Sequence, residues 1–253
     1  MHWINVLAFV LLLTSGLQIF NAYPVLNWGK SSYTGRPPIL QMDARLDEQG
    51  NPLGVTRVLG HEFNTTGVLG MSGGSRRGFP AWLTLPGPQW LAMARRWHFF
   101  FAWVLVINGL AYIGYSLASR HLTRDLAPTR ADWRSLGQSI RDHLLLRHPQ
   151  GEAARRYNIL QKLAYLGVIF VLFPLLILMG WAMSPGLNAL FTGWVDVFGG
   201  REAARTIHFV VAWLLVGFVF IHLVEVVVGG FWNNLRSMVT GRYRVTPGEN
   251  GHE

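Results

Sequence analysis

Residues 206–223 read TIHFVVAWLLVGFVFIHL, an apolar stretch with one histidine near each end. His208 and His222 are 14 positions apart. That spacing advances an α-helix by about 21 Å and close to four whole turns. Both imidazoles therefore leave such a helix from nearly the same face. Because the hydrocarbon core of a bilayer is about 30 Å thick, one histidine would lie near each leaflet.

Composition extends this interpretation to the whole chain of 253 residues, of which 51% are hydrophobic and 14% charged. Four uncharged runs approach the roughly 20 residues that a spanning helix needs. They are residues 3–20, 99–119, 163–184 and 209–224. A soluble protein would need a much larger polar shell to bury them. The sequence predicts an all-α membrane protein, a four-helix bundle with helices at about 3–20, 95–119, 159–184 and 204–229.

Cysteine usage and charge exclude several classes of function. The chain has no cysteine, so it cannot itself hold an iron–sulfur cluster, a covalent c-type haem or a disulfide. Its net charge is +9, but the basic residues gather beside the helix ends. Membrane topology explains that placement more simply than nucleic acid does, so no nucleic-acid partner is expected.

Basic residues also set the orientation. Residues 120–157 contain eight arginines, namely Arg120, Arg124, Arg130, Arg134, Arg141, Arg147, Arg155 and Arg156. The tail, residues 230–253, adds Arg236, Arg242 and Arg244. Short basic connections stay in the cytoplasm. This loop, the tail and both termini are therefore expected on the cytoplasmic side of a bacterial inner membrane. The loop of residues 21–94 is then periplasmic, and its many glycines and prolines favour mainly turns and short irregular elements.

Two smaller features concern the helices and their connections. The first apolar run lacks a preceding Lys or Arg and a small-residue cleavage site, so we expect it to be retained as a helix. Pro174 is expected to kink the third helix. Residues 187–198 form an amphipathic stretch that is expected to lie along the membrane interface.

Topology sorts the histidines into two levels. His98 and His208 fall at the outer leaflet, whereas His2 and His222 fall at the inner leaflet. Two imidazoles at each level are what a haem with two histidine ligands requires, so the sequence predicts two b-type haems. His121, at the cytoplasmic end of the second helix, is an alternative to His2 as the inner ligand.

Other readings of these residues remain open at this stage. A single histidine at membrane depth can be a hydrogen-bonded structural residue. A bare metal site fits less well, because the two levels lie about 20 Å apart and no carboxylate accompanies the outer pair. Several glycines either make room for a flat macrocycle or serve helix packing: Gly16, Gly109, Gly114 and Gly217. Three arginines either pair with outer haem propionates or anchor the interface: Arg95, Arg96 and Arg205.

Five segments resemble a known family. They are HWIN at 2–5, SGLQIFNA at 15–22, RRWHFFFAW at 95–103, YNILQK at 157–162 and NNLRSMVTGRY at 233–243. Together with the His208/His222 spacing, they are similar to the bacterial di-haem cytochrome b subunits that anchor periplasmic oxidoreductases. The thiosulfate-reductase type matches best; the subunits of formate dehydrogenase and nickel–iron hydrogenase are related.

The resemblance implies which residues carry the function. It implies that the haem iron ligands are His2, His98, His208 and His222. It also implies a quinone site at Asn158 and Gln161, because an amide pair can hydrogen-bond the carbonyl groups of a quinone. The alternative role of these two amides is helix capping. Lys162 and Glu225 would relay protons to the cytoplasm.

One departure concerns His2, which directly follows Met1, whereas the family carries a basic stretch before this histidine. A ligand on the first helical turn is less firmly held, unless the natural start lies further upstream. The expected function is electron transfer between the quinone pool and a periplasmic oxidoreductase subunit or a soluble electron carrier, with a molybdenum-containing partner by analogy. No site for substrate chemistry is expected in this chain. The alternative function is a haem-free membrane anchor or small proton-coupled transporter.

Overall fold

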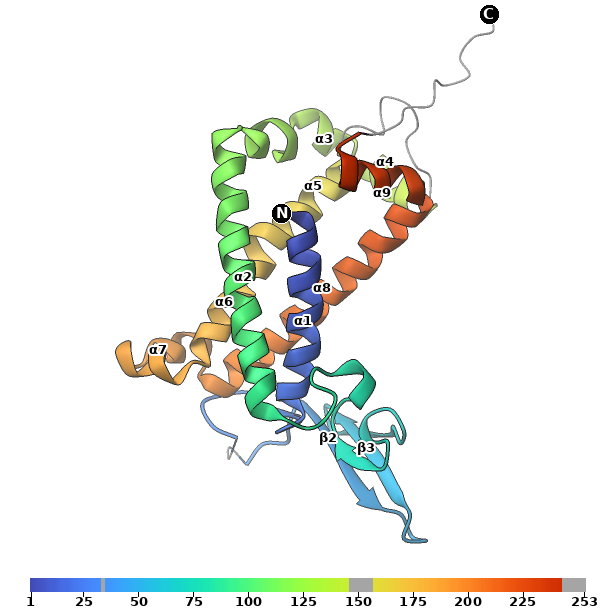
Figure 1. Cartoon of the computed structure of the whole chain (residues 1–253), viewed down its shortest axis with the longest axis vertical. Coiled ribbons are helices and arrows are strands. Elements are labelled where there is room, and N and C mark those ends of the chain that lie inside the picture. The colour runs from blue at the N-terminus through green and yellow to red at the C-terminus, as the bar shows by residue number, and fades with distance from the viewer. Residues whose placement is uncertain (33–34, 146–156, 243–253) are drawn as a thin grey trace, which may run out of the picture. The chain divides into compact units, whose positions relative to one another are not determined.

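The computed structural model describes residues 1–32, 35–145 and 157–242. Four of the predicted arginines, Arg147, Arg155, Arg156 and Arg244, lie outside these residues. The described chain is mostly helical, and four helices are long and apolar enough to cross a bilayer (Figure 1). They are α1 (His2–Phe20), α2 (Leu91–Ala118), the interrupted third helix (Ile159–Ala182) and α8 (Arg201–Val228). This confirms the predicted fold class.

The exposed faces of these helices are apolar. Trp103, Ile107 and Phe220 are each at least 60% exposed, although they lie in the middle of long helices. Exposing such side chains to water costs about 25 cal/mol for every Å² of apolar surface, whereas lipid accepts them without that cost. The chain is therefore a multi-pass membrane protein.

Contacts divide the chain into two compact units. The first unit comprises residues 1–110 and 175–212, and the second comprises residues 111–174 and 213–253. His2, His98 and His208 belong to the first unit. His222 belongs to the second, together with the amide pair of Asn158 and Gln161.

The third helix, which Pro174 was expected to kink, contains a π-helical turn in its middle. It consists of α5 (Ile159–Gly167), a π-helical turn (Val168–Leu172) and α6 (Phe173–Ala182). Pro174 has no N–H to donate, and its ring clashes with the carbonyl group of the residue four positions earlier. The backbone widens into a π turn immediately before the proline, which relieves that clash without ending the helix.

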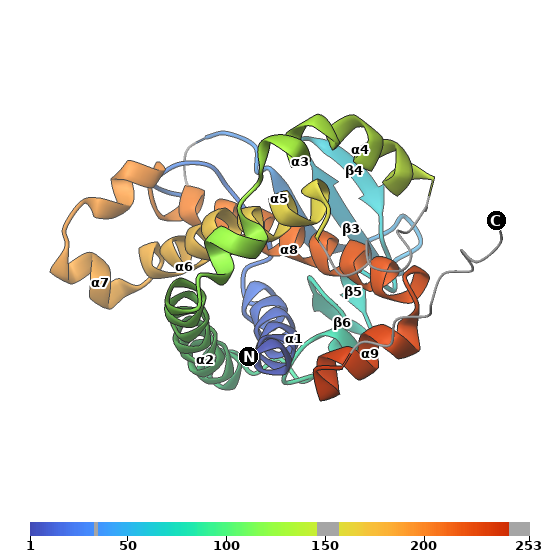
Figure 2. The ribbon, with the colours of Figure 1, turned by 90° about the horizontal axis from the view of Figure 1, so that it is seen from above.

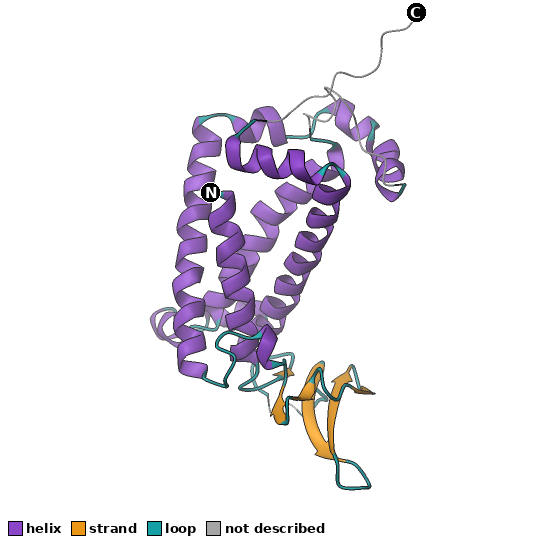
Figure 3. Cartoon of the chain, turned by 45° about the vertical axis from the view of Figure 1, so that its right-hand side comes forward, coloured by secondary structure: helices purple, strands orange, loops and turns teal. Residues whose placement is uncertain are grey.

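The α1–α2 connection, residues 21–90, contains β-structure that the sequence analysis missed (Figure 3). Four antiparallel strands follow one another in order across a sheet: β1 (Val25–Leu26), β2 (Leu40–Leu46), β3 (Pro52–Val58) and β4 (His61–Asn64). A hairpin of β5 (Gly70–Ser72) and β6 (Ser75–Arg77) follows. The overlooked signal was the turn Asp47–Asn51, in which Asp47 accepts two backbone N–H groups and Gly50 adopts a positive φ.

Between α6 and α8 the chain forms α7 (Pro185–Leu190) and a short 3-10 helix (Trp194–Phe198). Leu190 and Val197 are more than 70% exposed there. Exposed apolar residues on short helices support the predicted interfacial position of this stretch.

The second unit adds three helices that were expected only as connecting segments: α3 (Arg130–Arg134), α4 (Leu136–Leu144) and α9 (Phe231–Thr240). A capping box starts α3, because the Thr129 side chain accepts the N–H of Asp132 while the Asp132 carboxylate accepts that of Thr129. Helix α5 lies beside α3 and α4 (Figure 2).

A buried arginine joins the α1–α2 connection to the end of α1. Arg77 donates to the carbonyl oxygens of Phe79 and Gly87 at 2.6 and 3.1 Å, and to the hydroxyl of Thr84 at 2.8 Å. It also donates to Gln18 Oε1 of α1 at 3.3 Å. Burial lowers the pKa of the Arg77 guanidinium from its ordinary value. Four acceptors therefore replace the water that this charge has lost.

We expect Arg77→Ala to lower the free energy of unfolding by about 3 kcal/mol, because it leaves several buried acceptors unpaired. Arg76→Ala is the matched control. Arg76 is the neighbouring residue, its side chain is 71% exposed, and it pairs with Asp43 at 2.7 Å. Its replacement should cost less than about 1 kcal/mol. Thermal unfolding of the two purified variants measures the difference, and equal losses would contradict the assigned role of Arg77.

Candidate functional site

The first unit brings His98 of α2 and His208 of α8 together. Their ring centroids are 6.2 Å apart, and the ring planes are inclined by 61°. At this distance the two imidazole rings are close neighbours. The outer pair predicted from topology is therefore a spatial pair in the structure.

Hydrogen bonds to helix backbones determine which ring nitrogens face a ligand. His98 Nδ1 lies 3.1 Å from the carbonyl oxygen of Leu12 in α1. His208 Nδ1 lies 2.9 Å from that of Leu176 in α6. A carbonyl oxygen only accepts, so both Nδ1 atoms must carry the proton. In the neutral imidazole Nε2 is then unprotonated, which is the state in which imidazole binds a metal.

Glycines let each imidazole approach a neighbouring helix. A Cβ added at Gly16 of α1 would lie 3.2 Å from His98 Cε1, closer than ordinary packing allows. A Cβ added at Gly180 of α6 would lie 3.6 Å from His208 Cε1, an ordinary contact. Gly16, which was expected to make room for a macrocycle or for helix packing, thus makes room for the imidazole itself.

The residues present fit a haem. Two metal–nitrogen bonds of about 2 Å, extended by the distance from Nε2 to each ring centre, separate the centroids by about 6 Å. The observed 6.2 Å agrees with that separation. A bare ion such as zinc is held by three or four protein ligands, and no cluster of three or more His, Cys, Asp or Glu occurs among the described residues. A haem supplies four nitrogens of its own and needs only two axial ligands from the protein.

Arg205, one turn before His208, is engaged with the protein. Its guanidinium donates to the carbonyl oxygen of Tyr23 and lies over the rings of Phe20 and Tyr23 at 5.3 and 5.0 Å. It also lies 3.8 Å from Glu202. These contacts join α8 to the end of α1, which supports the anchoring role of Arg205 over a role in binding propionates.

The first turn of α1, which carries His2, is tied to α2. Asn108 is buried and donates to the carbonyl oxygen of Met1 at 3.1 Å and to Asn5 Oδ1 at 2.7 Å. This hydrogen bonding opposes the fraying expected of a terminal turn. Asn108 is not among the residues predicted above to have a role. Its signal was available, because an amide inside an apolar spanning run is rare and commonly has a specific partner.

The second unit places His222 at one end of a row of aromatic rings. The His222 ring stacks on Phe218 one turn earlier, with centroids 6.1 Å apart and planes inclined by 13°. Phe218 meets Tyr165 edge-on at 6.3 Å, and Tyr165 meets Tyr157 edge-on at 5.5 Å. The row leads from His222 on α8 to the residue immediately before Asn158.

Asn158 and Gln161 cap the start of α5. Asn158 Oδ1 accepts the N–H of Gln161 at 2.8 Å, and Gln161 Oε1 accepts the N–H of Asn158 at 3.1 Å. This reciprocal pattern is the capping box, so the capping alternative is realised. It uses only the two amide oxygens. The NH₂ groups are separate donors, so capping and quinone binding are compatible.

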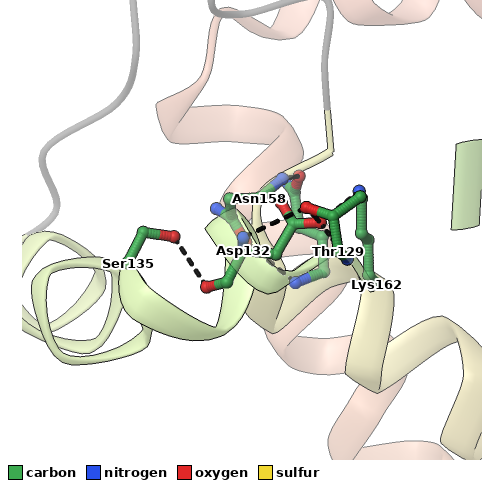
Figure 4. Close-up of polar contacts among 6 residues, drawn as sticks. Thr129, Asp132, Ser135, Asn158 and Lys162 are labelled. Atoms are coloured by element: carbon green, nitrogen blue, oxygen red, sulfur yellow. Dashed lines mark hydrogen bonds and ion pairs between the residues drawn. The ribbon is translucent and has the colours of Figure 1, made fainter. Parts of the chain in front are cut away.

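Lys162, predicted as a proton relay, forms an ion pair with Asp132 (Figure 4). Lys162 Nζ lies 2.9 Å from Asp132 Oδ2, and the two side chains are 11% and 20% exposed. The ion pair and the hydrogen bonds from Thr129 lower the pKa of Asp132 to about 2. Glu225, the other predicted relay, lies 3.5 Å from His143 Nδ1. His121, the alternative inner ligand, pairs through Nδ1 with Asp125 at 2.7 Å.

A known protein family resembles this chain over almost its whole length. The sequence model of the prokaryotic cytochrome b561 family matches residues 1–241. Over 151 residues, the chain is 32% identical to the putative protein-methionine-sulfoxide reductase subunit YedZ1 of Azospira oryzae. That alignment covers 58% of this chain and 70% of the relative. No solved structure matches the chain.

The low pKa of Asp132 predicts how the stability of the folded protein changes in acid. A carboxyl group whose pKa is depressed in the folded state stabilises the fold above its ordinary pKa of 3.8, and this contribution is lost as the pH falls through about 2. We expect the stability difference between the wild type and Asp132→Asn to be constant from pH 7 to about 4 and to shrink toward pH 2. Thermal unfolding followed by circular dichroism measures it. A difference that grows on acidification would contradict the ion pair.

Proposed function

This chain belongs to the prokaryotic cytochrome b561 family, whose members are haem b electron-transfer membrane proteins, and from this premise we propose its function. The chain is a di-haem b-type cytochrome that carries electrons between the membrane quinone pool and an oxidoreductase partner. The observation that carries the proposal is the outer pair, His98 and His208, with its centroid separation of 6.2 Å. Bound b-type haem supplies one-electron redox chemistry at each level.

The outer ligands are His98 and His208. Their Nδ1–H groups donate to the carbonyl oxygens of Leu12 and Leu176, which keeps both rings in one orientation and leaves Nε2 for iron. Such hydrogen bonds also raise the basicity of the ligand, which is one way in which a protein adjusts the potential of a haem.

The inner ligands are His2 and His222, with His121 as the alternative to His2. The hydrogen bonds from Asn108 support the first turn on which His2 lies. The stacked Phe218 restricts the His222 ring. A histidine side chain that is already held in one rotamer loses little further conformational entropy when it binds iron. Such restraint therefore favours its role as a ligand.

Asn158 and Gln161 bind the quinone through their NH₂ groups, which can donate to its carbonyl oxygens. Their oxygens remain in the capping box, so each amide plane is fixed before the quinone arrives. Tyr157 and Tyr165 lie between this amide pair and His222 within the second unit and offer apolar ring surfaces to a quinone head group.

The partner is an oxidoreductase subunit or a soluble electron carrier that binds the periplasmic side, where the α1–α2 connection, residues 21–90, is the longest expected loop. The relative's printed name, a putative methionine-sulfoxide reductase subunit, supports an oxidoreductase partner, and a molybdenum-containing one is proposed by analogy. A cavity of about 720 Å³ in this connection includes Asn21, Arg36 and Arg76 in its lining. The arginine distribution supports a bacterial inner-membrane location with both termini in the cytoplasm.

Histidine replacement tests the ligands. The wild type should contain two haems per chain by pyridine haemochrome assay, and His208→Ala and His222→Ala should each contain one. His222→Ala should also abolish reduction of the remaining haem by quinol, because the haem nearest the quinone is lost. Two haems in either variant would overturn the ligand assignment. A colourless wild type, produced with ample haem supply, would instead favour a haem-free anchor or proton-coupled transporter.

Two glycine-to-alanine variants, at Gly16 and Gly180, test how closely the imidazoles of His98 and His208 are packed. Gly16→Ala would place a methyl group 3.2 Å from His98 Cε1, so we expect the outer ligand to shift and the reduced α-band or midpoint potential of one haem to change. Gly180→Ala, at 3.6 Å from His208 Cε1, is the matched control and should be nearly silent. Equal effects of the two alanines would argue against close packing at Gly16.

A further inference from the structure

We propose that Asp132 and Lys162 are positioning residues for quinone binding, because their ion pair joins α3 to the first turn of α5 and holds the Asn158–Gln161 amide pair in place. This inference rests on the proposed quinone site. All four residues belong to the second unit. The pair acts through the backbone of α5 and does not itself contact the quinone.

Lys162 is directly connected to both amide residues. It follows Gln161 in sequence, and its backbone N–H donates to the carbonyl oxygen of Asn158 at 3.0 Å. A displacement of the Lys162 backbone therefore moves the turn that carries both amides. Its side chain is buried, and Nζ lies 2.9 Å from Asp132 Oδ2.

Asp132 receives several donors on one carboxylate oxygen. Thr129 donates to Asp132 Oδ2 through its backbone N–H at 2.7 Å and through its hydroxyl at 2.8 Å. Lys162 donates to the same oxygen. The carboxylate that completes the capping box of α3 is thus also the counter-ion for α5 (Figure 4). Two capping boxes, one at the start of each helix, are coupled by a single ion pair.

The position of Lys162 explains why it needs this counter-ion. A cation in the first turns of a helix opposes the helix dipole, which favours negative charge there. A buried ammonium group also loses the hydration that it has in water. Asp132 offsets both costs. Without it, Lys162 gains by turning toward water, and the first turn of α5 loses a restraint.

The consequence for quinone binding follows from geometry. Two amide NH₂ groups can donate to a quinone together only if their separation and planes are fixed. A looser first turn weakens binding of the quinone in every redox state about equally, so it raises KM and leaves kcat nearly unchanged. A residue that exchanged protons with the quinone would instead lower kcat.

The test uses the full-length, haem-loaded chain in detergent, with a short-chain ubiquinol and a short-chain menaquinol as separate reductants. A soluble one-electron acceptor reoxidises the haems, so that steady-state KM and kcat are defined after the direct reaction of quinol with the acceptor is subtracted. Lys162→Met and Asp132→Asn are each expected to raise KM for the active quinol about three- to tenfold. Haem content, the dithionite-reduced spectrum and kcat should stay within twofold of the wild type. Lys162→Arg keeps the ion pair and should restore KM. The double variant should resemble either single variant, because the two residues act as one unit.

Asp142→Asn is the matched control, since Asp142 is on the adjacent helix α4 and accepts an exposed hydrogen bond from Gln138 at 2.8 Å. It should leave KM unchanged. An unchanged KM in Lys162→Met, additive losses in the double variant, or loss of haem in both single variants would overturn the positioning role. If Asn158→Leu raises KM while the ion-pair variants do not, the inference fails and the proposed function stands. If neither quinol reduces the wild-type haem, the proposed function itself fails.

Discussion

The structure depends on two hydrogen bonds from imidazole Nδ1–H groups to helix carbonyl oxygens. His98 and His208 each use a neighbouring helix, through Leu12 and Leu176, as the acceptor. Inside a bilayer these nitrogens have no water to turn to, so each bond is costly to lose. The same two bonds determine the tautomer, orient the rings and leave Nε2 of each histidine for the iron of the proposed outer haem. In that proposed site, folding and cofactor binding would be coupled through the same side chains.

The lipid environment explains why several polar residues of the first unit have specific partners. Asn108 joins the first turn of α1 to α2, and Arg205 joins α8 to the residues at the end of α1. A polar group in or near hydrocarbon is tolerated when it has a partner, and each partnership also fixes where two helices meet. Arg77 does the same for the α1–α2 connection, with four acceptors around one buried guanidinium.

The second unit shows how helix capping orients the side chains of the proposed quinone site. The amide oxygens of Asn158 and Gln161 start α5, which leaves their NH₂ groups with fixed planes. Asp132 starts α3 in the same manner and, through Lys162, connects the two helix starts. The first N–H groups of every helix lack partners within the helix, and capping side chains accept hydrogen bonds from them. A capping side chain is thereby already ordered, so a second role requires little further loss of conformational entropy.

The sequence by itself determined the four spanning helices, the irregularity before Pro174 and the partnership of His98 with His208, because apolar length, proline chemistry and helical periodicity are local properties. It did not reveal the sheet of the α1–α2 connection, whose strands are short and pair across turns. The tertiary structure alone decided that Gly16 packs on an imidazole, that Asn108 supports the first turn and that Lys162 meets Asp132. Each of these depends on atoms from segments far apart in the chain, and only the packing of helices brings such atoms together.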